Sequence, residues 1–224
     1  GDRMEHAKKR SPLNFIVGLT VVILTVIGFV SVVDFISDRI QSTANRSQQE
    51  QTQLYEDFIS PVIMNDPDPF DDITKANLQQ LLSIAVWSVI DSGADPEKYE
   101  YTDDGMLMPQ KEVEDEFVSL FGSEVKLSHS TVDGGDGVTF RYSKKKQCYI
   151  IPITGIMPIY LPDVTEVDEK DSSVVLTVGY LASADWVQDS EGNMVPPEPG
   201  KYMKITLGKN ADGSFFVKAI QNMD

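Results

Sequence analysis

The chain has 224 residues and a formal net charge of −16 at pH 7, because 35 acidic side chains outnumber 19 basic ones. A charge excess of this size and sign repels nucleic acid and anionic lipid headgroups, so it argues against a nucleic-acid-binding protein and suits a cationic partner. The single cysteine, Cys148, cannot form an intramolecular disulfide, which excludes a disulfide-stapled domain and favours a bacterial over a eukaryotic exported protein.

Residues 13–33 form an uncharged, mostly apolar run of 21 residues. As a helix this run spans about 31 Å, which matches a hydrocarbon core of ~30 Å, whereas the apolar part of a cleaved secretory signal has about 7–15 residues. Four basic residues precede the run within residues 1–12, and the next one is Arg39. We therefore predict an uncleaved transmembrane helix over 13–33, with residues 1–12 in the cytoplasm and the rest of the chain outside the cell.

Residues 34–65 are polar and rich in glutamine, with apolar side chains only towards the two ends. Because no apolar stripe connects those ends, the segment predicts a solvated helix or stalk, and a coiled coil is the alternative. The run NDPDPFDD at 65–72 breaks helices and marks a boundary. We expect a folded extracytoplasmic domain over 66–224.

Two helices are predicted at the start of this domain. The first begins after Asp72, a helix-capping residue, and ends at Gly93; its back half is apolar on nearly every side, which predicts burial against a sheet. The second begins with Pro109 in its first turn and ends at Gly122. Apolar residues at the spacing of one helix face are Val113, Phe117, Leu120 and Phe121.

Strand-like patterns follow the second helix. They cover residues 138–143, 148–154, 173–183, 201–209 and 214–222. The predicted class is α+β, with two helices packed on one curved antiparallel sheet of about five strands. This order of elements resembles the cup-shaped fold of nuclear transport factor and the cystatins.

Residues typical of catalysis or metal binding are sparse after the predicted membrane helix. That part contains one histidine, His129, which we place on a surface loop, and Cys148, which we expect to be a buried and inert thiol. The aspartates in the glycine-rich run 130–137 lack the spacing of a calcium loop and are expected in turns. We predict no catalytic residues, no metal site and no cofactor.

Aromatic residues on the predicted strands and first helix are the candidates for a ligand-binding cup. They are Trp87, Tyr142, Tyr149, Tyr160 and Tyr180. A concave sheet lined by tyrosines can hold a sugar or a peptide. The alternative is that these side chains fill the core between the sheet and the first helix.

Three segments also resemble a known pattern: PQKEVEDEFVSLFG (109–122), YSKKKQCYIIPITG (142–155) and IYLPDVTEVDEKDSSVVLTVGYL (159–181). They read as a helix ending in Leu-Phe-Gly, a tyrosine-flanked hairpin, a Tyr-x-Pro-x-Val turn and a strand ending in Val-Gly-Tyr. The pattern resembles membrane-anchored extracytoplasmic proteins of Gram-positive, especially clostridial, bacteria. The overall plan also resembles the scaffold subunits of type IV secretion and conjugation machines. Neither resemblance supplies a residue of known function.

These features together predict a single-pass, membrane-anchored binding or scaffold module at the bacterial cell surface. Its partners are the lipid bilayer, through residues 13–33, and a protein or cell-wall component outside. Two alternatives remain open. One is a regulator or inhibitor of cell-wall hydrolases, and the other is an enzyme that uses a carboxylate in the cup for proton transfer.

Overall fold

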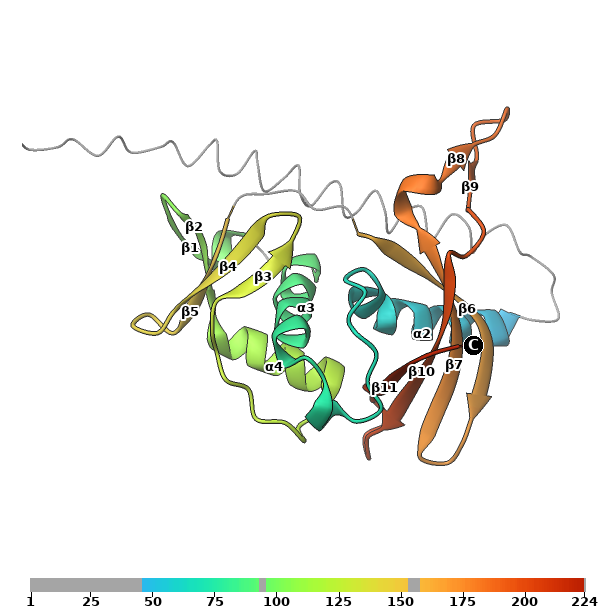
Figure 1. Ribbon diagram of the computed structural model, residues 1–224, viewed down its shortest axis with the longest axis horizontal. Helices are drawn as coiled ribbons and strands as arrows, with labels where there is room; N and C mark the ends of the chain where they lie inside the picture. Colours follow the sequence, from blue (N-terminus) through green and yellow to red (C-terminus); the bar gives the residue numbers. More distant parts are fainter. Residues whose placement is uncertain (1–45, 93–95, 153–157, 224) are drawn as a thin grey trace, which may run out of the picture.

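The computed structural model describes residues 46–92, 96–152 and 158–223 (Figure 1). The predicted cytoplasmic arm and transmembrane helix, and residues 34–45 of the predicted stalk, lie outside these ranges. Across the described ranges, the structure contains no helix with both the length and the apolar character needed to cross a membrane.

The described chain is α+β, as predicted, but its strands form two main sheets rather than one. A five-stranded antiparallel sheet has the order β1-β2-β5-β4-β3: Glu100–Thr102, Gly105–Pro109, Cys148–Ile151, Val138–Ser143 and Val132–Gly135. A four-stranded antiparallel sheet has the order β11-β10-β7-β6: Phe215–Asn222, Lys201–Lys209, Ser173–Ala182 and Tyr160–Glu169. A two-stranded ribbon, β8–β9, comprises Val187–Gln188 and Met194–Val195. The prediction of a single sheet is therefore wrong, because an alternating pattern shows which face of a strand is buried but not which strands pair.

The two predicted helices are present, with corrected starts. Helix α4, Gln110–Phe121, ends before Gly122, as predicted, and the four apolar residues of its predicted face are buried. Pro109, which was predicted in its first turn, is instead its N-cap and the last residue of β2. Helix α3, Leu78–Asp91, begins five residues later than predicted. Its N-cap is Asn77, whose side chain accepts a hydrogen bond from the Gln80 N–H. Asp72 instead caps the short 3₁₀ turn η1, Ile73–Lys75.

A third helix, α2, covers Arg46–Ile63 and lies within the segment predicted to be a stalk. Tyr55, Ile59, Val62 and Ile63 of this helix are buried in the main hydrophobic core. Their spacing of four, three and one places them on one helix face. The prediction of a solvated stalk is wrong for residues 46–63, and the folded unit begins before residue 66.

Helices α3 and α4 lie between the two sheets, and one continuous core joins both halves (Figure 1). Helix α3 packs on β3, while α4 contacts both β2 and β11. Helix α2 packs on β6. The connection between α2 and α3 forms a two-residue bridge to β11, in which Phe70 and Ile220 exchange N–H···O=C bonds of 2.8 Å. This bridge occupies part of the outer edge of β11.

Candidate functional site

The five aromatic residues of the predicted cup fall into separate groups. Trp87 on α3 packs edge-on against Phe140 at 4.9 Å, and its indole N–H donates to the Gly134 carbonyl oxygen. Tyr142 and Tyr149 are cross-strand partners on β4 and β5, with ring centroids 5.2 Å apart. These three side chains belong to the half of the molecule built on the five-stranded sheet.

Tyr160 and Tyr180 lie on the four-stranded sheet instead, with ring centroids 5.4 Å apart. The Lys201 ammonium lies 4.8 Å from the Tyr180 ring centroid and 5.3 Å from that of Tyr160. Asp66 accepts a hydrogen bond of 2.6 Å from the same ammonium. This aromatic pair therefore already holds a cation of the chain itself. The predicted residues do not line one common cup.

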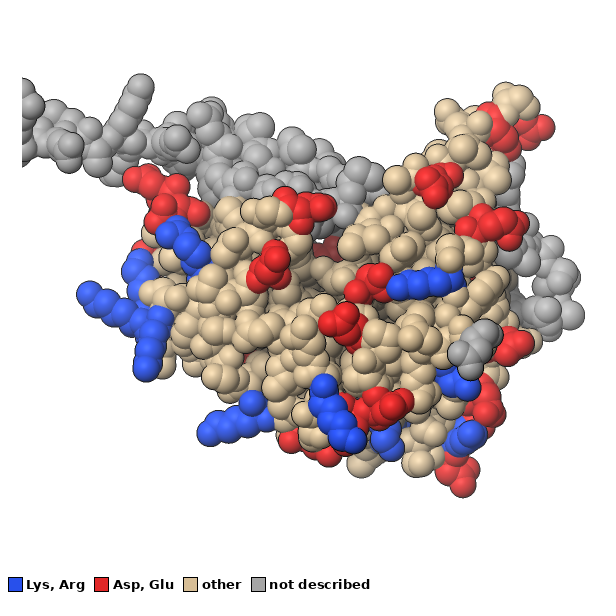
Figure 2. Space-filling view, in the orientation of Figure 1, with Lys and Arg blue, Asp and Glu red and all other residues tan. Residues whose placement is uncertain are grey.

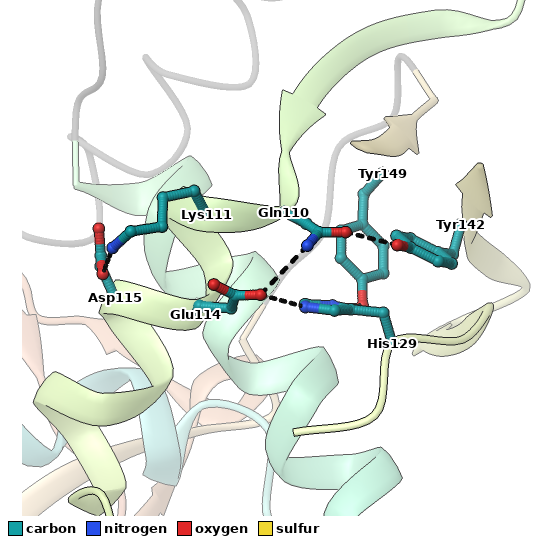
Figure 3. Close-up of polar contacts among 7 residues, drawn as sticks. All are labelled: Gln110, Lys111, Glu114, Asp115, His129, Tyr142 and Tyr149. Carbon is teal, nitrogen blue, oxygen red and sulfur yellow. Dashed lines mark hydrogen bonds and ion pairs between the residues drawn. The ribbon is translucent and has the colours of Figure 1, made fainter. Parts of the chain in front are cut away.

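His129 lies in the loop between α4 and β3, as predicted, but its side chain is largely buried, with only 10% exposed. Its Nε2 atom lies 2.8 Å from a carboxylate oxygen of Glu114, and its Nδ1 atom lies 2.8 Å from the Tyr149 hydroxyl (Figure 3). A carboxylate only accepts hydrogen bonds, so Nε2 carries a proton. In the neutral ring Nδ1 then accepts from the Tyr149 hydroxyl.

Two further side chains extend this cluster from α4 to the sheet. The Gln110 amide donates to Glu114 at 3.2 Å and accepts from the Tyr142 hydroxyl at 2.5 Å (Figure 3). The imidazole stacks on the Tyr142 ring at 5.2 Å. We call the five residues Gln110, Glu114, His129, Tyr142 and Tyr149 the histidine cluster.

The geometry of the histidine cluster suits positioning better than catalysis. A glutamate, a histidine and a hydroxyl in sequence resemble a proton relay, but the hydroxyl of Tyr149 is at the enclosed end, where this residue is 0% exposed. Burial raises the pKa of Tyr149 above its ordinary value. The neighbouring thiol of Cys148 is buried as predicted, and burial raises its pKa too. The cluster therefore fastens the segment after α4 to the sheet.

A groove of about 510 Å³ lies between the first turns of α2 and the second half of β6. The side chains that line it are mostly amides, hydroxyls and carboxylates. They are Gln48, Gln51, Thr52, Tyr55, Val164, Thr165, Glu166, Val167 and Glu169. We call this the α2–β6 groove.

Both walls of the α2–β6 groove are held by hydrogen bonds between them. The Tyr55 hydroxyl donates to Glu169 at 2.7 Å, and the Gln51 amide donates to the same carboxylate. Burial and the hydrogen bond to Glu169 raise the pKa of Tyr55 to about 12, so this hydroxyl stays protonated. Lys209 lies 3.6 Å from the other oxygen of Glu169 and balances its charge.

A second carboxylate of α2 contacts the edge of β6 beside the groove. Glu56 accepts a hydrogen bond of 2.9 Å from the Val164 N–H, at a point where the pairing of β6 with β7 shifts register. Burial, with smaller contributions from the nearby Asp163 and Asp57 carboxyls, raises the pKa of Glu56 to about 7, against the lowering effect of the Val164 N–H. This bond attaches α2 to one end of the strand edge.

Sequence reasoning missed the α2–β6 groove because both of its walls were misassigned. The Tyr-x-Pro-x-Val turn predicted at residues 160–164 is wrong, because these residues form the first half of β6. The other wall was expected to be a stalk. The spacing of Tyr55, Ile59, Val62 and Ile63 was the available signal for a packed helix.

No protein-family model, no curated protein and no solved structure matches this chain. The resemblance to extracytoplasmic proteins of Gram-positive bacteria therefore stays a prediction. Within the described ranges, no three His, Cys, Asp or Glu residues are grouped so that they could hold a metal ion. The candidate site rests on the geometry of the groove.

Proposed function

We propose that this chain is a membrane-anchored binding module of the bacterial cell surface, and that it takes its partner through the α2–β6 groove. The observation that carries the proposal is the groove itself, about 510 Å³ in volume and lined by hydrogen-bonding side chains. This volume lies in the range of binding sites, ~300–1,000 Å³. The anchor is residues 13–33, and the partner is a protein or a cell-wall component outside the cell.

A binding role fits the chemistry of the groove better than an enzymatic one. The nine lining residues include no histidine, cysteine, serine or lysine. Of the three ionisable groups in the lining, Tyr55 is kept protonated, Glu169 is already paired with Lys209, and Glu166 is exposed and accepts a hydrogen bond from the Thr177 hydroxyl. Nucleophilic and acid–base catalysis both need an activated group within reach of the substrate. The groove instead offers donors and acceptors that can recognise a partner.

The alternative of an inhibitor of cell-wall hydrolases has weaker support. It requires a negative patch focused enough to fill the basic groove of an enzyme. On the face shown in Figure 2, carboxylates are spread over the four-stranded half and lysines occur among them, while a separate basic group marks the β4–β5 end. This distribution of charge favours a binding module with one local acidic edge over an inhibitor that fills a basic groove with an extended acidic surface.

Site-specific photocrosslinking in intact cells tests the binding role. We would place a photoreactive amino acid at Val167, which lines the groove and is 39% exposed, in the full-length chain. The matched control is Val118, which is 47% exposed on α4 and outside the groove lining. We expect a defined adduct from position 167 and none of the same mass from position 118. Identical adducts from both positions, or none from either, would contradict the proposal.

The anchor has its own test. We expect the full-length protein to stay in the membrane fraction after alkaline carbonate washing, and protease added to intact protoplasts to remove the domain after residue 45. A chain that lacks residues 1–33 should lose membrane association. Retention of the truncated chain in washed membranes would show that residues 13–33 are not the anchor.

A further inference from the structure

We infer that the partner of the α2–β6 groove is an extended, cationic peptide segment that pairs with the free edge of β6 as an additional strand. This inference rests on the proposed function and specifies its partner. It combines three independent features of one place in the fold: an unpaired strand edge, a groove along that edge and a local excess of carboxylates.

The strand edge comes first. Within the described ranges, β6 has a strand neighbour only on its β7 side. The backbone N–H and C=O groups on its outer side are therefore not paired with another strand in this part of the chain. Helix α2 contacts β6 at Val164 through Glu56 and at the Glu169 side chain through Tyr55 and Gln51. Residues 165–169 are nevertheless all exposed. Five strand residues extend about 16 Å, enough to pair with a peptide of similar length. The opposite edge of the sheet, on β11, is already bridged by Phe70.

The groove gives the added strand a place for its side chains. It lies beside the same exposed half of β6, with Gln48, Gln51 and Thr52 of α2 as the facing wall. In strand addition the backbone ladder supplies affinity, and pockets for alternate side chains supply specificity. Amide and hydroxyl groups of α2 can then bond to side chains that project from the added strand.

Charge decides the chemistry of the partner. Residues 163–171 contain five carboxylates and a single basic residue, Lys170. Of these carboxylates, Glu166 and Glu169 line the groove. Glu169 is paired with Lys209 and Asp168 with Lys170, so the charge that a partner meets in the lining is chiefly that of Glu166. A neutral or acidic strand would place its own side chains against this excess, whereas lysine or arginine at alternate positions forms cross-strand pairs of opposite charge. A cationic segment therefore fits this edge best.

A peptide-binding measurement with the full-length protein tests the inference. The protein is placed in nanodiscs of zwitterionic phosphatidylcholine, so that the lipid does not attract the probe. The probe is a fluorescein-labelled peptide of alternating lysine and valine, and its counterpart alternates glutamate and valine. Fluorescence anisotropy gives affinity, and amide hydrogen exchange locates the bound strand. We expect the lysine peptide to bind, the glutamate peptide not to bind, and slowed exchange at residues 165–169.

Charge-reversal variants separate a specific site from general attraction to an acidic protein. Glu166→Lys changes an exposed groove residue, and Glu124→Lys makes the same change on an exposed residue after α4, outside the groove. We expect Glu166→Lys to weaken binding of the lysine peptide about tenfold and Glu124→Lys to leave it unchanged. Equal losses in both variants, or slowed exchange that spares β6, would overturn the inference.

The two proposals fail in different ways. If the position-167 crosslink captures a partner but the lysine peptide does not bind, the cationic strand is wrong and the binding module stands. If the crosslink captures a second copy of this chain through the same edge, the sheet pairs with itself and the cationic partner is also wrong. If position 167 gives no adduct and no peptide binds, both proposals fail.

Discussion

The histidine cluster and the α2–β6 groove use the same kinds of side chain, arranged around a buried imidazole in the first and beside open space in the second. Each contains a tyrosine hydroxyl, a glutamate and a glutamine in hydrogen-bond contact. In both places these groups bond to one another, and each place has a buried tyrosine, Tyr149 at 0% and Tyr55 at 2% exposure. In the histidine cluster they close around the side chain of His129, which is 10% exposed. In the groove they border about 510 Å³ of open space. Residue type alone therefore does not identify a binding site; what surrounds the group does.

The space next to these polar groups determines whether they can bind a ligand. An enclosed polar group must find its partners within the protein, since an unpaired one costs about 1–3 kcal/mol. Once all partners are internal, the group stabilises one arrangement of the chain and has nothing left to offer a ligand. Polar groups beside open space exchange their bonds with water, so a partner can replace that water at low cost.

The largest expected effect comes from the core that both regions share. Phe140 is 0% exposed and packs on Trp87, so we expect Phe140→Ala to lower the free energy of unfolding by about 3–5 kcal/mol. Because the core is continuous, both halves should unfold together. Chemical denaturation, followed by tryptophan fluorescence, measures whether the halves unfold together. The signals of Trp87 and Trp186 are separated by changing the other tryptophan to Phe. Separate midpoints for the two tryptophans would show that the halves are independent.

A pH-dependent effect is next in size and belongs to the groove side. The pKa of Glu56 is raised from 4.5 to about 7, so the folded state holds this proton more tightly than the unfolded chain. Its contribution to stability is therefore complete below about pH 4.5 and is lost as the pH rises through about 7. We expect the free energy of unfolding of Glu56→Gln to be larger than that of the parent protein by on the order of 2 kcal/mol at pH 8, and the two to be equal near pH 4.

Denaturation midpoints of Glu56→Gln and the parent protein between pH 4 and pH 8 check this sign. Glu124→Gln is the matched control, because this carboxyl is exposed. A parallel pH dependence in Glu56→Gln and the parent protein would show that Glu56 is not the responsible group. Burial raises the pKa of Asp163 as well, so part of the dependence should persist in the variant.

A smaller effect distinguishes the histidine cluster from the groove. Tyr149→Phe removes the hydroxyl 2.8 Å from His129 Nδ1 and leaves that nitrogen enclosed without its partner. We expect a loss of about 1–2 kcal/mol in stability with unchanged crosslinking at position 167. Tyr202→Phe, at a residue that is 43% exposed, should change neither. If Tyr149→Phe lost the adduct at position 167 but kept the free energy of unfolding of the parent protein, the histidine cluster would be part of the binding site.

The smallest effect on stability is expected in the groove. Glu166→Gln should stay within about 0.5 kcal/mol of the parent protein, because the residue is exposed. Its affinity for the lysine peptide should nevertheless fall. Denaturation and anisotropy on the same preparation compare the two quantities. A variant that loses stability and affinity in proportion would indicate that Glu166 holds the fold and does not contact the partner.

The sequence identified elements whose signals are local. Helix α4 has a glycine after its last residue and four apolar residues on one face, and the structure confirms both. Strands β4 and β10 have the predicted bounds. Helix α2 was mistaken for a stalk because its apolar residues lie in the second half of a glutamine-rich segment, where its single buried face is easily overlooked.

Features that depend on distant residues were not accessible to the same reasoning. His129 meets Glu114 and Tyr149, which are 15 and 20 positions away, only after α4 and β5 have packed together. The α2–β6 groove joins Tyr55 to Glu169, 114 positions apart. The division of the strands into two sheets is of the same kind, because pairing is a choice among all strands of the chain.

The bridge between Phe70 and Ile220 has a consequence for stoichiometry. A sheet with two open edges can recruit one strand after another and grow into a filament. In the four-stranded sheet this bridge engages β11 at Ile220, whereas β6 has no strand on its outer side within the part of the chain that the structure describes. The four-stranded sheet should therefore offer a partner one edge of its own rather than two, so that each copy of the protein presents one site for strand addition.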